Sequence, residues 1–285
     1  MAGVRIVTDS TSDLPAEWRA QYGIVTVTLP INIGTESFRD TLDLTPAQFF
    51  ARQEAGPPYP TTANPAVGQV AETFRRLHTE GAESICALCF SSSLGGTYAA
   101  VALAAAAVAD EITVEVIDTR AASIGVGFLA IEAAKCAATG ASLAEVIARV
   151  RSLIPEIATV FVVDSLKWLE RGGRINKARA LLGSVLTIKP LLVLRDGALE
   201  PLQQPRTRAR ALDALAQWVQ SFPNPAALAV LYDGTSEALP EAEAFAARLG
   251  TTATHQPPII THYGTVYAVH LGPRVLGAVV LKHRQ

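Results

Sequence analysis

The sequence predicts an α/β protein of two domains, the first with a parallel, Rossmann-like sheet and the second of α+β type with a mixed sheet. Through the first half of the chain, apolar strand-like runs alternate with helical patterns, which is typical of parallel strands joined by right-handed crossovers. After Pro155 the alternation stops, and two apolar runs flank Arg195, Asp196 and Gly197 as in an antiparallel hairpin. At 285 residues the chain is long enough for two domains, which we expect to span 1–157 and 158–285.

Helix caps and helix-breaking residues indicate where the helices of the first domain begin and end. Thr45 to Gln48 and Ser142 to Glu145 have the spacing of capping boxes, and Gly23 and Gly81 follow helical patterns that they should end. The expected strands cover 5–8, 24–33, 84–90 and 112–117, and the expected helices cover 15–22, 46–53, 65–78, a segment ending at 109, 121–139 and 142–154.

The second domain is predicted from shorter and less regular patterns. Gly172 and Gly173 break a helical turn, and the hairpin at residues 195–197 makes at least part of the sheet antiparallel. The expected strands cover 159–163, 188–194, 198–203, 227–232, 266–270 and 277–281, and the expected helices cover 166–170, 178–182 and 208–219.

Composition and charge exclude several classes of function. The formal net charge of −2 gives no basic field for nucleic-acid binding. The longest uncharged apolar stretch, 98–109, is far shorter than the ~20 residues that span a bilayer, and the first residues lack the pattern of a signal peptide. The 3 cysteines form no disulfide framework. We therefore expect a soluble cytoplasmic protein with no membrane span and no nucleic-acid partner.

No cofactor, nucleotide or metal motif is present. Cys86 and Cys89 spell CxxC, but on a strand their odd separation places them on opposite faces, so we expect core packing. The histidines, at 78, 255, 262, 270 and 283, form no metal spacing such as HExxH. Neither a P-loop nor a GxGxxG follows a predicted strand, so we expect no bound ATP and no dinucleotide.

The stretch Phe90 to Tyr98, FSSSLGGTY, is the strongest candidate for a site. It follows a buried strand and opens a helix, so its backbone N–H groups and the positive end of the helix dipole favour an anion. Two alternatives stay open: the hydroxyls of Ser91, Ser92 and Ser93 cap the helix, or one of them is a nucleophile with His270 as its base. The GxSxG pattern of a nucleophile elbow is absent.

Three further polar positions strengthen the interpretation as an anion site. Thr62 lies at a second hydroxyl-bearing helix entrance, Arg206 follows the predicted hairpin, and His270 is placed at the end of an apolar strand. Each alone is as well explained by an ordinary surface or core position. Together, however, they supply the hydroxyl, N–H and cationic donors that a carboxylate needs.

A set of motifs in a fixed order resembles the DegV family. The resemblance runs from about residue 4 to 281, and several motifs at matching intervals make it specific. They are TDSTSDLP at 8–15, PTTANP at 60–65, SSSLGGTY at 91–98, VIDT at 116–119, LERGGRIN at 169–176, IKP at 188–190, RDG at 195–197, RT at 206–207 and HLGP at 270–273.

The resemblance implies a DegV-like fold of two α/β domains with a long-chain fatty acid, such as palmitate, held between them. In many bacteria such proteins resemble the lipid-presenting subunit of a fatty acid kinase, which offers the carboxylate to a separate ATP-binding partner. The resemblance thus implies a lipid-binding protein that is not itself an enzyme. A serine-dependent acyl hydrolase or transferase, and a lipid-sensing interaction protein without a kinase, remain as alternatives.

By position, the resemblance implies that Thr62, Arg206 and His270 bind the carboxylate. Gly95 stands where the family usually has serine, and Ser93 stands where it usually has glycine. Backbone N–H groups at Gly95 and Gly96, or the Ser93 hydroxyl, would then replace the missing donor. Two more positions differ from the family's usual motifs. Ala63 stands where the family usually has serine, and Arg274 stands where it usually has glycine. Arg171 and Arg174, with Lys177 and Arg179 nearby, are candidates for docking the kinase partner.

Overall fold

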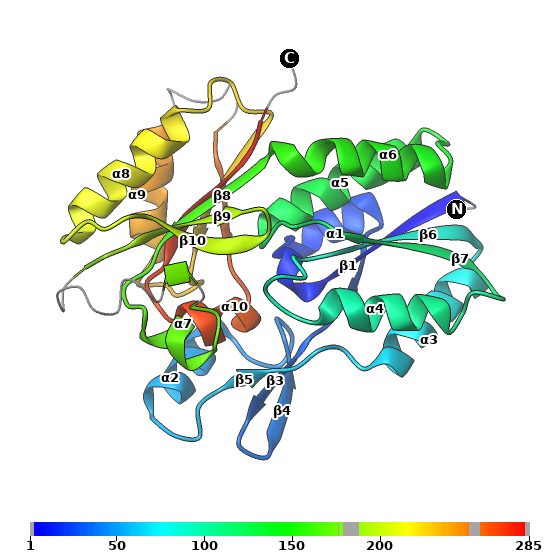
Figure 1. Ribbon diagram of the computed structural model, residues 1–285, viewed down its shortest axis with the longest axis horizontal. Coiled ribbons are helices and arrows are strands. Elements are labelled where there is room, and N and C mark those ends of the chain that lie inside the picture. Colours follow the sequence, from blue (N-terminus) through cyan, green and yellow to red (C-terminus); the bar gives the residue numbers. More distant parts are fainter. Residues whose placement is uncertain (1–2, 176, 179–187, 251–256, 283–285) are drawn as a thin grey trace. The chain divides into compact units, whose positions relative to one another are not determined.

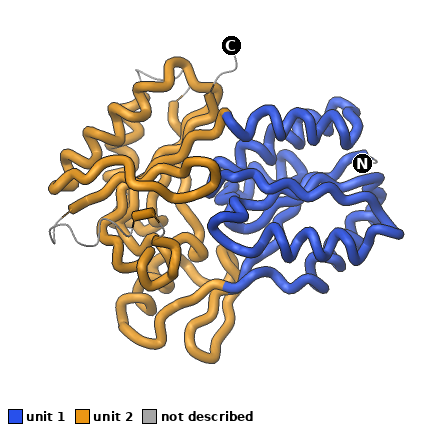
Figure 2. Tube along the Cα trace, viewed as in Figure 1, with its two compact units in different colours: residues 1–30, 63–155 blue, residues 31–62, 156–285 orange. Residues whose placement is uncertain are grey.

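The computed structural model describes residues 3–175, 177–178, 188–250 and 257–282. The chain divides into two compact units, residues 1–30 with 63–155 and residues 31–62 with 156–285 (Figure 2). The last boundary lies two residues from the predicted one, but the segment 31–62 belongs to the second unit, whereas the sequence placed it in the first. Long-range contacts explain the difference: the Gln53 side chain donates to the Ala268 carbonyl, and Asp40 accepts from Thr265.

The first unit is a three-layer α/β/α structure around a parallel sheet. The strand order is β2-β1-β6-β7, with α3 and α4 on one face and α5 and α6 on the other (Figure 1). Its strands are β1 (Gly3–Asp9), β2 (Val25–Val27), β6 (Ala82–Cys89) and β7 (Thr113–Asp118). Its helices are α1 (Ala16–Tyr22), α3 (Val67–Thr79), α4 (Thr97–Ala106), α5 (Ile124–Ala138) and α6 (Leu143–Leu153). The predicted parallel sheet is therefore confirmed.

The second unit contains a mixed sheet of order β10-β9-β8-β13-β11-β12. The predicted hairpin is present, since β9 and β10 pair antiparallel with Ala198 opposite Arg195. The strands are β8 (Ile157–Val162), β9 (Leu191–Arg195), β10 (Ala198–Gln203), β11 (Ala227–Tyr232), β12 (Ile259–His262) and β13 (Leu276–Leu281). Helices α8 (Arg208–Gln220) and α9 (Leu239–Leu249) bury their apolar faces against this sheet.

A smaller sheet and three short helices complete the second unit. The sheet has the order β4-β3-β5, and Ile31 of β3 lies opposite Thr62 of β5. Its strands are β3 (Pro30–Ile33), β4 (Glu36–Arg39) and β5 (Thr61–Thr62), and the helices are α2 (Pro46–Glu54), α7 (Lys167–Arg171) and α10 (Thr265–Leu271). Helix α10 contacts α2, α7 and β5, and so it fixes the surroundings of Thr62.

The sequence predicted helix ends correctly where the hydrogen bonds that form them are local. Both capping boxes are formed: Thr45 accepts from the Gln48 N–H, Ser142 accepts from the Glu145 N–H, and each partner side chain binds back. Gly23 ends α1 in the left-handed conformation, with φ 62°. These bonds close within four residues and need no tertiary partner.

The prediction of a strand over 266–270 is wrong, because this segment is helix α10. Its β-branched valines suggested a strand, but its buried residues, which include Val266, Val269 and Leu271, recur with helical spacing. The side chain of Asp40 caps the helix from far away in the chain, accepting from the Thr265 hydroxyl at 2.7 Å and from the Val266 N–H at 3.3 Å. A cap 225 residues distant leaves no local signal.

Other differences are smaller. The expected strand over 24–33 is two strands, β2 and β3, which belong to different sheets. Helix α9 and strand β12 were not predicted. The expected helix over 178–182 lies outside the described residues except at Ala178, and His255 and His283 lie outside them altogether. Among the helices of the described residues, none combines the length and the apolar character needed to cross a membrane.

Candidate functional site

Thr62 and His270 form a hydrogen-bonded pair in the second unit. The Thr62 hydroxyl oxygen lies 3.1 Å from Nε2 of His270, although the two residues are 208 positions apart. Strand β5 positions the threonine through its pairing with Ile31, and the last turn of α10 positions the histidine. The structure thus joins two of the residues that the sequence singled out.

The His270 ring packs directly on the backbone of Gly172. A Cβ at position 172 would lie 2.1 Å from Nδ1 of His270, so any larger residue would displace the imidazole. The carbonyl of Gly172 in turn accepts a hydrogen bond of 2.7 Å from the Arg174 guanidinium. Sequence reasoning treated Gly172 only as a helix breaker, because its role depends on a side chain about 100 residues away.

Burial, with the nearby positive charge of Arg174, lowers the pKa of His270 to about 4. The imidazole is therefore neutral near pH 7 and carries one N–H. Nδ1 is buried without a hydrogen-bond partner in the described part of the chain, whereas Nε2 faces Thr62. With the proton on Nε2, the ring donates to the Thr62 oxygen and leaves the threonine O–H available to donate to a ligand.

This lowered pKa gives a testable pH dependence of stability. Below pH ~6.5 the unfolded chain protonates His270 while the folded protein does not, so the free energy of unfolding should fall from pH ~6.5 to ~4 and this contribution should then level off. Urea unfolding of the wild type and of His270→Gln across this range measures it. The difference in the free energy of unfolding between the wild type and His270→Gln should shrink as the pH is lowered. A difference that does not depend on pH would contradict the lowered pKa of His270.

The turn Phe90–Gly96 lies at the point of the first unit where the strand order reverses. Strand β1 connects on one side to β2, and β6 on the other side to β7, so the carboxyl ends of β1 and β6 form the topological switch point. Asp9 ties the two ends together, accepting from the Phe90 N–H at 3.0 Å and from Thr11. Ligands of open α/β sheets bind at such a position, which supports the candidate stretch.

The hydroxyls of Ser91 and Ser92 in this turn are hydrogen-bonded to neighbouring groups, and no side chain caps α4. The N-cap of α4 is Gly96, which supplies no side-chain cap. Ser92 donates to the Asp118 carboxylate at 2.5 Å, and the Ser91 oxygen accepts from the Ser93 N–H at 3.3 Å. Ser93 itself is exposed. The alternative that these hydroxyls only cap the helix is therefore wrong.

Gly95 packs against the ring of Phe90, which is 6% exposed. A Cβ at position 95 would lie 2.8 Å from the Cζ atom of that ring. The Phe90 side chain thus occupies the space that a serine side chain at this position would need. This local pairing explains why the position is glycine here.

We expect Gly95→Ser to lower the free energy of unfolding by about 1–3 kcal/mol, because the added side chain overpacks against Phe90. In the Phe90→Leu background the same change should cost much less, since the ring atom is gone. Urea unfolding of the four proteins of this cycle measures the coupling. Equal costs in both backgrounds would show that the ring does not exclude the serine.

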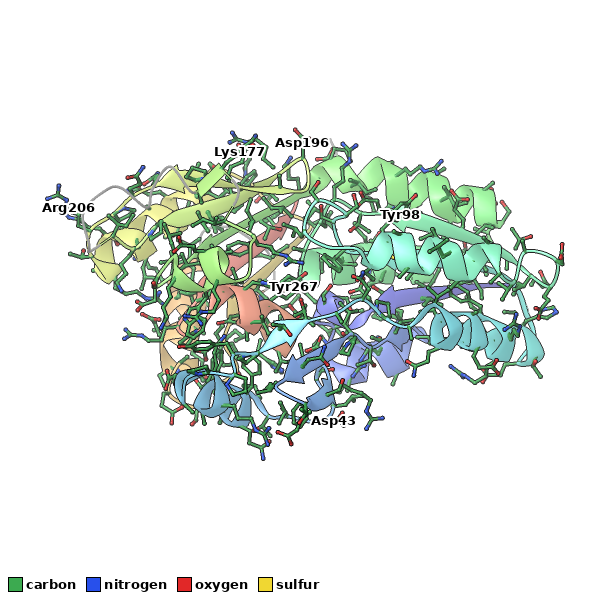
Figure 3. The ribbon with its side chains drawn as sticks, turned by 60° about the horizontal axis from the view of Figure 1, so that its bottom comes forward. Asp43, Tyr98, Lys177, Asp196, Arg206 and Tyr267 are labelled. Carbon is green, nitrogen blue, oxygen red and sulfur yellow. The ribbon has the colours of Figure 1, made fainter. Side chains whose placement is uncertain are left out.

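Arg206 is exposed, and the structure does not bring it to the Thr62–His270 pair. It precedes Thr207, the N-cap of α8, whose side chain accepts from the Arg210 N–H. Figure 3 shows the Arg206 side chain at the outer edge, apart from Tyr267 of α10. The arginine whose charge acts on His270 is instead Arg174. Arg206 remains a prediction from the motif alone.

The two arginines predicted to dock a partner differ in exposure. Arg171 is exposed and its guanidinium lies 3.4 Å above the ring centroid of Tyr59, whose ring meets Trp168 edge-on. Arg174 is partly buried and binds the Gly172 carbonyl. Arg171 therefore presents an ordered guanidinium edge at the surface, whereas Arg174 belongs to the surroundings of His270.

No cofactor or metal chemistry emerges from the described residues. Within them, no group of three or more His, Cys, Asp or Glu side chains could hold a metal ion. Cys86 and Cys89 are both buried, and burial raises the pKa of the Cys86 thiol to about 12. Their neighbours Ile85 and Ala87 share a core cluster with Cys89 but not with Cys86, as expected for side chains on opposite faces of a strand.

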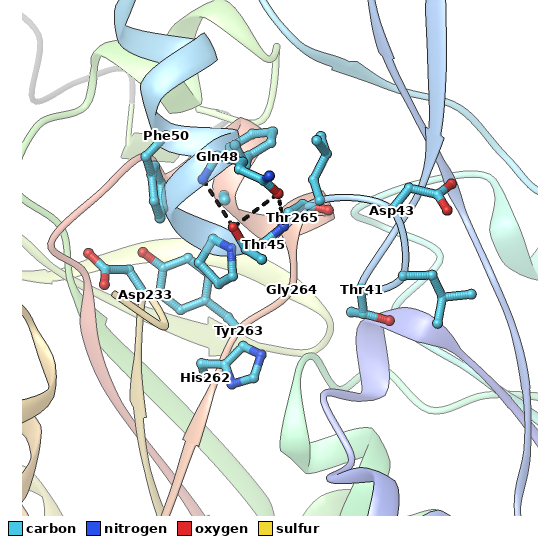
Figure 4. A pocket seen from close by; sticks show the side chains of 15 residues that line it. Thr41, Asp43, Thr45, Gln48, Phe50, Asp233, His262, Tyr263, Gly264 and Thr265 are labelled. Atoms are coloured by element: carbon cyan, nitrogen blue, oxygen red, sulfur yellow. Dashed lines mark hydrogen bonds between the residues drawn. The ribbon is translucent and has the colours of Figure 1, made fainter. Parts of the chain in front are cut away.

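A pocket of about 270 Å³ lies within the second unit, at the start of α2 and of α10 (Figure 4). Leu42, Phe49 and Phe50 line it together with the carboxylates Asp43 and Asp233, and the Thr45–Gln48 capping box stands at its edge. None of the predicted site residues lines this pocket. Because the two carboxylates would repel an anionic head group, we do not assign it to a carboxylate ligand.

The fold defines a class: a protein of two compact units that contain α/β sheets, with no nucleotide-binding motif in its sequence. Within that class, the chain belongs to the DegV family, since the model for "Uncharacterised protein, DegV family" matches residues 3–283. A DegV domain-containing protein of Halalkalibacterium halodurans is 33% identical over 280 residues, covering 97% of this chain and 98% of that protein.

Two solved structures show the same fold. The fatty-acid-binding DegV family protein of Thermus thermophilus superposes with a TM-score of 0.88 and is 31% identical, covering 99% of this chain and 100% of that one. DegV of Bacillus subtilis, described as a fatty acid binding protein, has a TM-score of 0.87 and 27% identity, with coverage of 99% and 100%. The predicted family and fold class are thereby confirmed.

Proposed function

We propose that this protein binds a long-chain fatty acid by its carboxylate and presents it to a separate ATP-binding kinase, without being an enzyme itself. The observation that carries the proposal is the Thr62–His270 pair, in which a neutral imidazole with its proton on Nε2 leaves the threonine hydroxyl free to donate. The fatty-acid-binding relatives of Thermus thermophilus and Bacillus subtilis support the choice of ligand.

The energetics of a lipid ligand agree with these donors. A carboxylate removed from water costs several kcal/mol unless it is hydrogen-bonded, so a fatty acid needs fixed donors at its head group. We assign Thr62 and His270 to this task, with the Ser93 hydroxyl and the N–H groups of Gly95 and Gly96 as a further donor set. Each methylene of the tail buried in apolar surroundings contributes about 0.8 kcal/mol, which favours long chains.

The kinase partnership rests on two features. The sequence has no P-loop, so the nucleotide is assigned to another protein. Arg171, exposed and stacked on Tyr59, offers a partner a preorganised guanidinium for carboxylate or phosphate groups. We also assign the exposed Arg206 to this partner-facing role, and we place the protein in the cytoplasm, where ATP is available.

Mass spectrometry of the purified protein under denaturing conditions tests the binding part of the proposal. A fatty acid should be released near stoichiometry, and delipidated protein should take up added palmitate. A protein that carries no lipid and fails to bind palmitate would end the proposal. If lipid binds but no ATP-binding protein phosphorylates it, the lipid-sensing alternative without a kinase is favoured.

Replacing the exposed Arg206 by alanine should leave fatty acid retention within about twofold of the wild type, because surface substitutions away from a site change free energies by little. Phosphorylation of the bound lipid by a partner kinase should decline instead. Measuring both lipid retention and lipid phosphorylation on this variant separates a role in binding the lipid from a role in docking the kinase. Loss of the lipid would return Arg206 to the carboxylate site that the motif predicts.

The alternative of a serine hydrolase finds no support in the contacts. Nε2 of His270 faces the Thr62 hydroxyl, and the Ser92 hydroxyl donates to Asp118, so neither is arranged as a nucleophile with its base. Ser92→Ala should therefore retain the fatty acid and change no background hydrolysis of an acyl ester. A loss of esterase activity in this variant with lipid binding intact would favour the enzyme.

A further inference from the structure

The sequence stretch before α3 contains a polar side chain that the site described above does not use. Asn64 lies two residues after Thr62 and directly before Pro65, which favours an extended backbone at Asn64. Its side chain is exposed, and its carboxamide forms no hydrogen bond within the described residues. An amide with two N–H donors and no partner in its own chain can donate to a ligand.

The carboxamide of Asn64 lies against the backbone of Gly96, at the start of α4. A Cβ at position 96 would lie 2.5 Å from Nδ2 of Asn64, 3.0 Å from Oδ1 and 3.1 Å from Cγ. The backbone of Gly96 has φ −94°, a conformation open to any residue, so conformation does not require glycine there. A Cβ there would instead meet the Asn64 amide, which would have to move away.

A second group at the same helix start also lacks a partner. Thr97 is 0% exposed, and its hydroxyl oxygen has no hydrogen bond to any described residue. A buried hydroxyl without a partner costs free energy, and a bound ligand or water satisfies it. The amide of Asn64 and the hydroxyl of Thr97 thus flank Gly96 with unused hydrogen-bonding groups. Two acidic side chains that hydrogen-bond to this turn are also bound to other groups. Asp118 accepts from Ser92 and from the Arg120 N–H, and Asp9 accepts from the Phe90 N–H and from Thr11.

We infer that Asn64 is a head-group-binding residue, held in place on Gly96, whose amide N–H donates to the carboxylate of the bound lipid and so selects fatty acids over lipids with neutral head groups. The inference rests on the proposed function, because it adds a donor to those proposed for the head group of the lipid. A carboxylate has two charged acceptor oxygens, and a hydrogen bond to a charged group is stronger than one to an alcohol. The selectivity between acid and alcohol should therefore depend on the amide.

The test compares the binding of palmitate and of 1-hexadecanol to the delipidated full-length protein. Asn64→Ala should weaken palmitate binding about tenfold to a hundredfold, which is the range for losing a hydrogen bond to a charged group, and should leave 1-hexadecanol binding unchanged. Asn64→Asp, which replaces the donor by a carboxylate of the same shape, should weaken palmitate binding further. An equal loss for palmitate and 1-hexadecanol, or no loss at all, overturns the inference.

A double-mutant cycle tests whether Gly96 acts through Asn64. Gly96→Ala should displace the amide and weaken palmitate binding to a similar extent as Asn64→Ala, and the double variant should be no weaker than Asn64→Ala alone. Additive losses would overturn this step. Gly68→Ala is the matched control, because nothing lies within 4 Å of a Cβ there, and it should bind as the wild type does.

The controls separate this inference from the proposed function. If the wild type itself binds no palmitate, the proposed function fails and the variants are not needed. If the wild type binds palmitate and Asn64→Ala binds it equally well, only the role of Asn64 is lost. Thermal unfolding of each ligand-free variant identifies any loss of binding that comes from a loss of folding.

Discussion

Thr62→Val is expected to lower the affinity for palmitate by about tenfold to a hundredfold, the range for losing a hydrogen bond to a charged group. Valine keeps the shape of threonine and the β-branch that suits strand β5, but it removes the hydroxyl that lies 3.1 Å from Nε2 of His270. The loss combines a missing donor to a charged carboxylate with a His270 N–H that no longer has an acceptor. Calorimetry on delipidated protein measures it.

The neighbouring residue provides the control for this prediction. Thr61 belongs to the same two-residue strand but is exposed, and its hydroxyl reaches only the Asn32 carbonyl at 3.5 Å. Thr61→Val makes the same chemical change and should leave palmitate binding unaltered. Equal affinities of the wild type and Thr62→Val would remove Thr62 from the carboxylate site, whatever the behaviour of the control.

The largest effect on stability is expected at Gly272, which follows α10. Its backbone, with φ 74° and ψ −169°, lies in a region that is essentially limited to glycine. A Cβ there would also lie 2.0 Å from Cδ1 of Trp168. Gly272→Ala should therefore lower the free energy of unfolding by about 2–6 kcal/mol, the sum of backbone strain and overpacking. Urea denaturation followed by tryptophan fluorescence measures it.

Gly173→Ala separates the two causes. Gly173 also has a positive φ, 69°, and belongs to the same unit, but nothing lies within 4 Å of a Cβ at that position. Alanine there should cost only the left-handed backbone conformation, about 1–2 kcal/mol. If Gly272→Ala costs no more than Gly173→Ala, Trp168 is free to move away and the close packing between α7 and α10 is not rigid.

The candidate site was predictable to the extent that its residues belong to local motifs. Thr62, Ser93, Gly95 and Gly96 lie in stretches whose helix entrances and small polar residues are visible in the sequence. His270 was chosen with Thr62 for the same carboxylate, and the structure brings the two side chains together, but His270 was placed on a strand, because the cap that Asp40 supplies to α10 comes from a distant segment. Arg206 was chosen from its motif, and its exposed position could not be read from the sequence.

The close packing of side chains against three glycines was missed for a common reason, although Gly95 and Gly96 themselves were chosen as backbone donors. The His270 ring packs against Gly172, the Asn64 amide packs against Gly96, and the Phe90 ring packs against Gly95. In the sequence Gly172 has the ordinary explanation of a helix break, and Gly95 and Gly96 have that of a turn whose backbone N–H groups face an anion. Only the coordinates show that a Cβ would meet a specific side chain, because two of those side chains lie about 30 to 100 residues away.

The sequence by itself determined the α/β class, the parallel sheet of the first unit, the hairpin and both capping boxes, because these depend on hydrophobic periodicity and on hydrogen bonds within a few residues. The tertiary structure decided that residues 31–62 join the second unit and that 265–271 is a helix. It also lowered the pKa of His270 and brought its ring to Thr62. Burial and contacts between distant segments, which local sequence does not encode, produce these features.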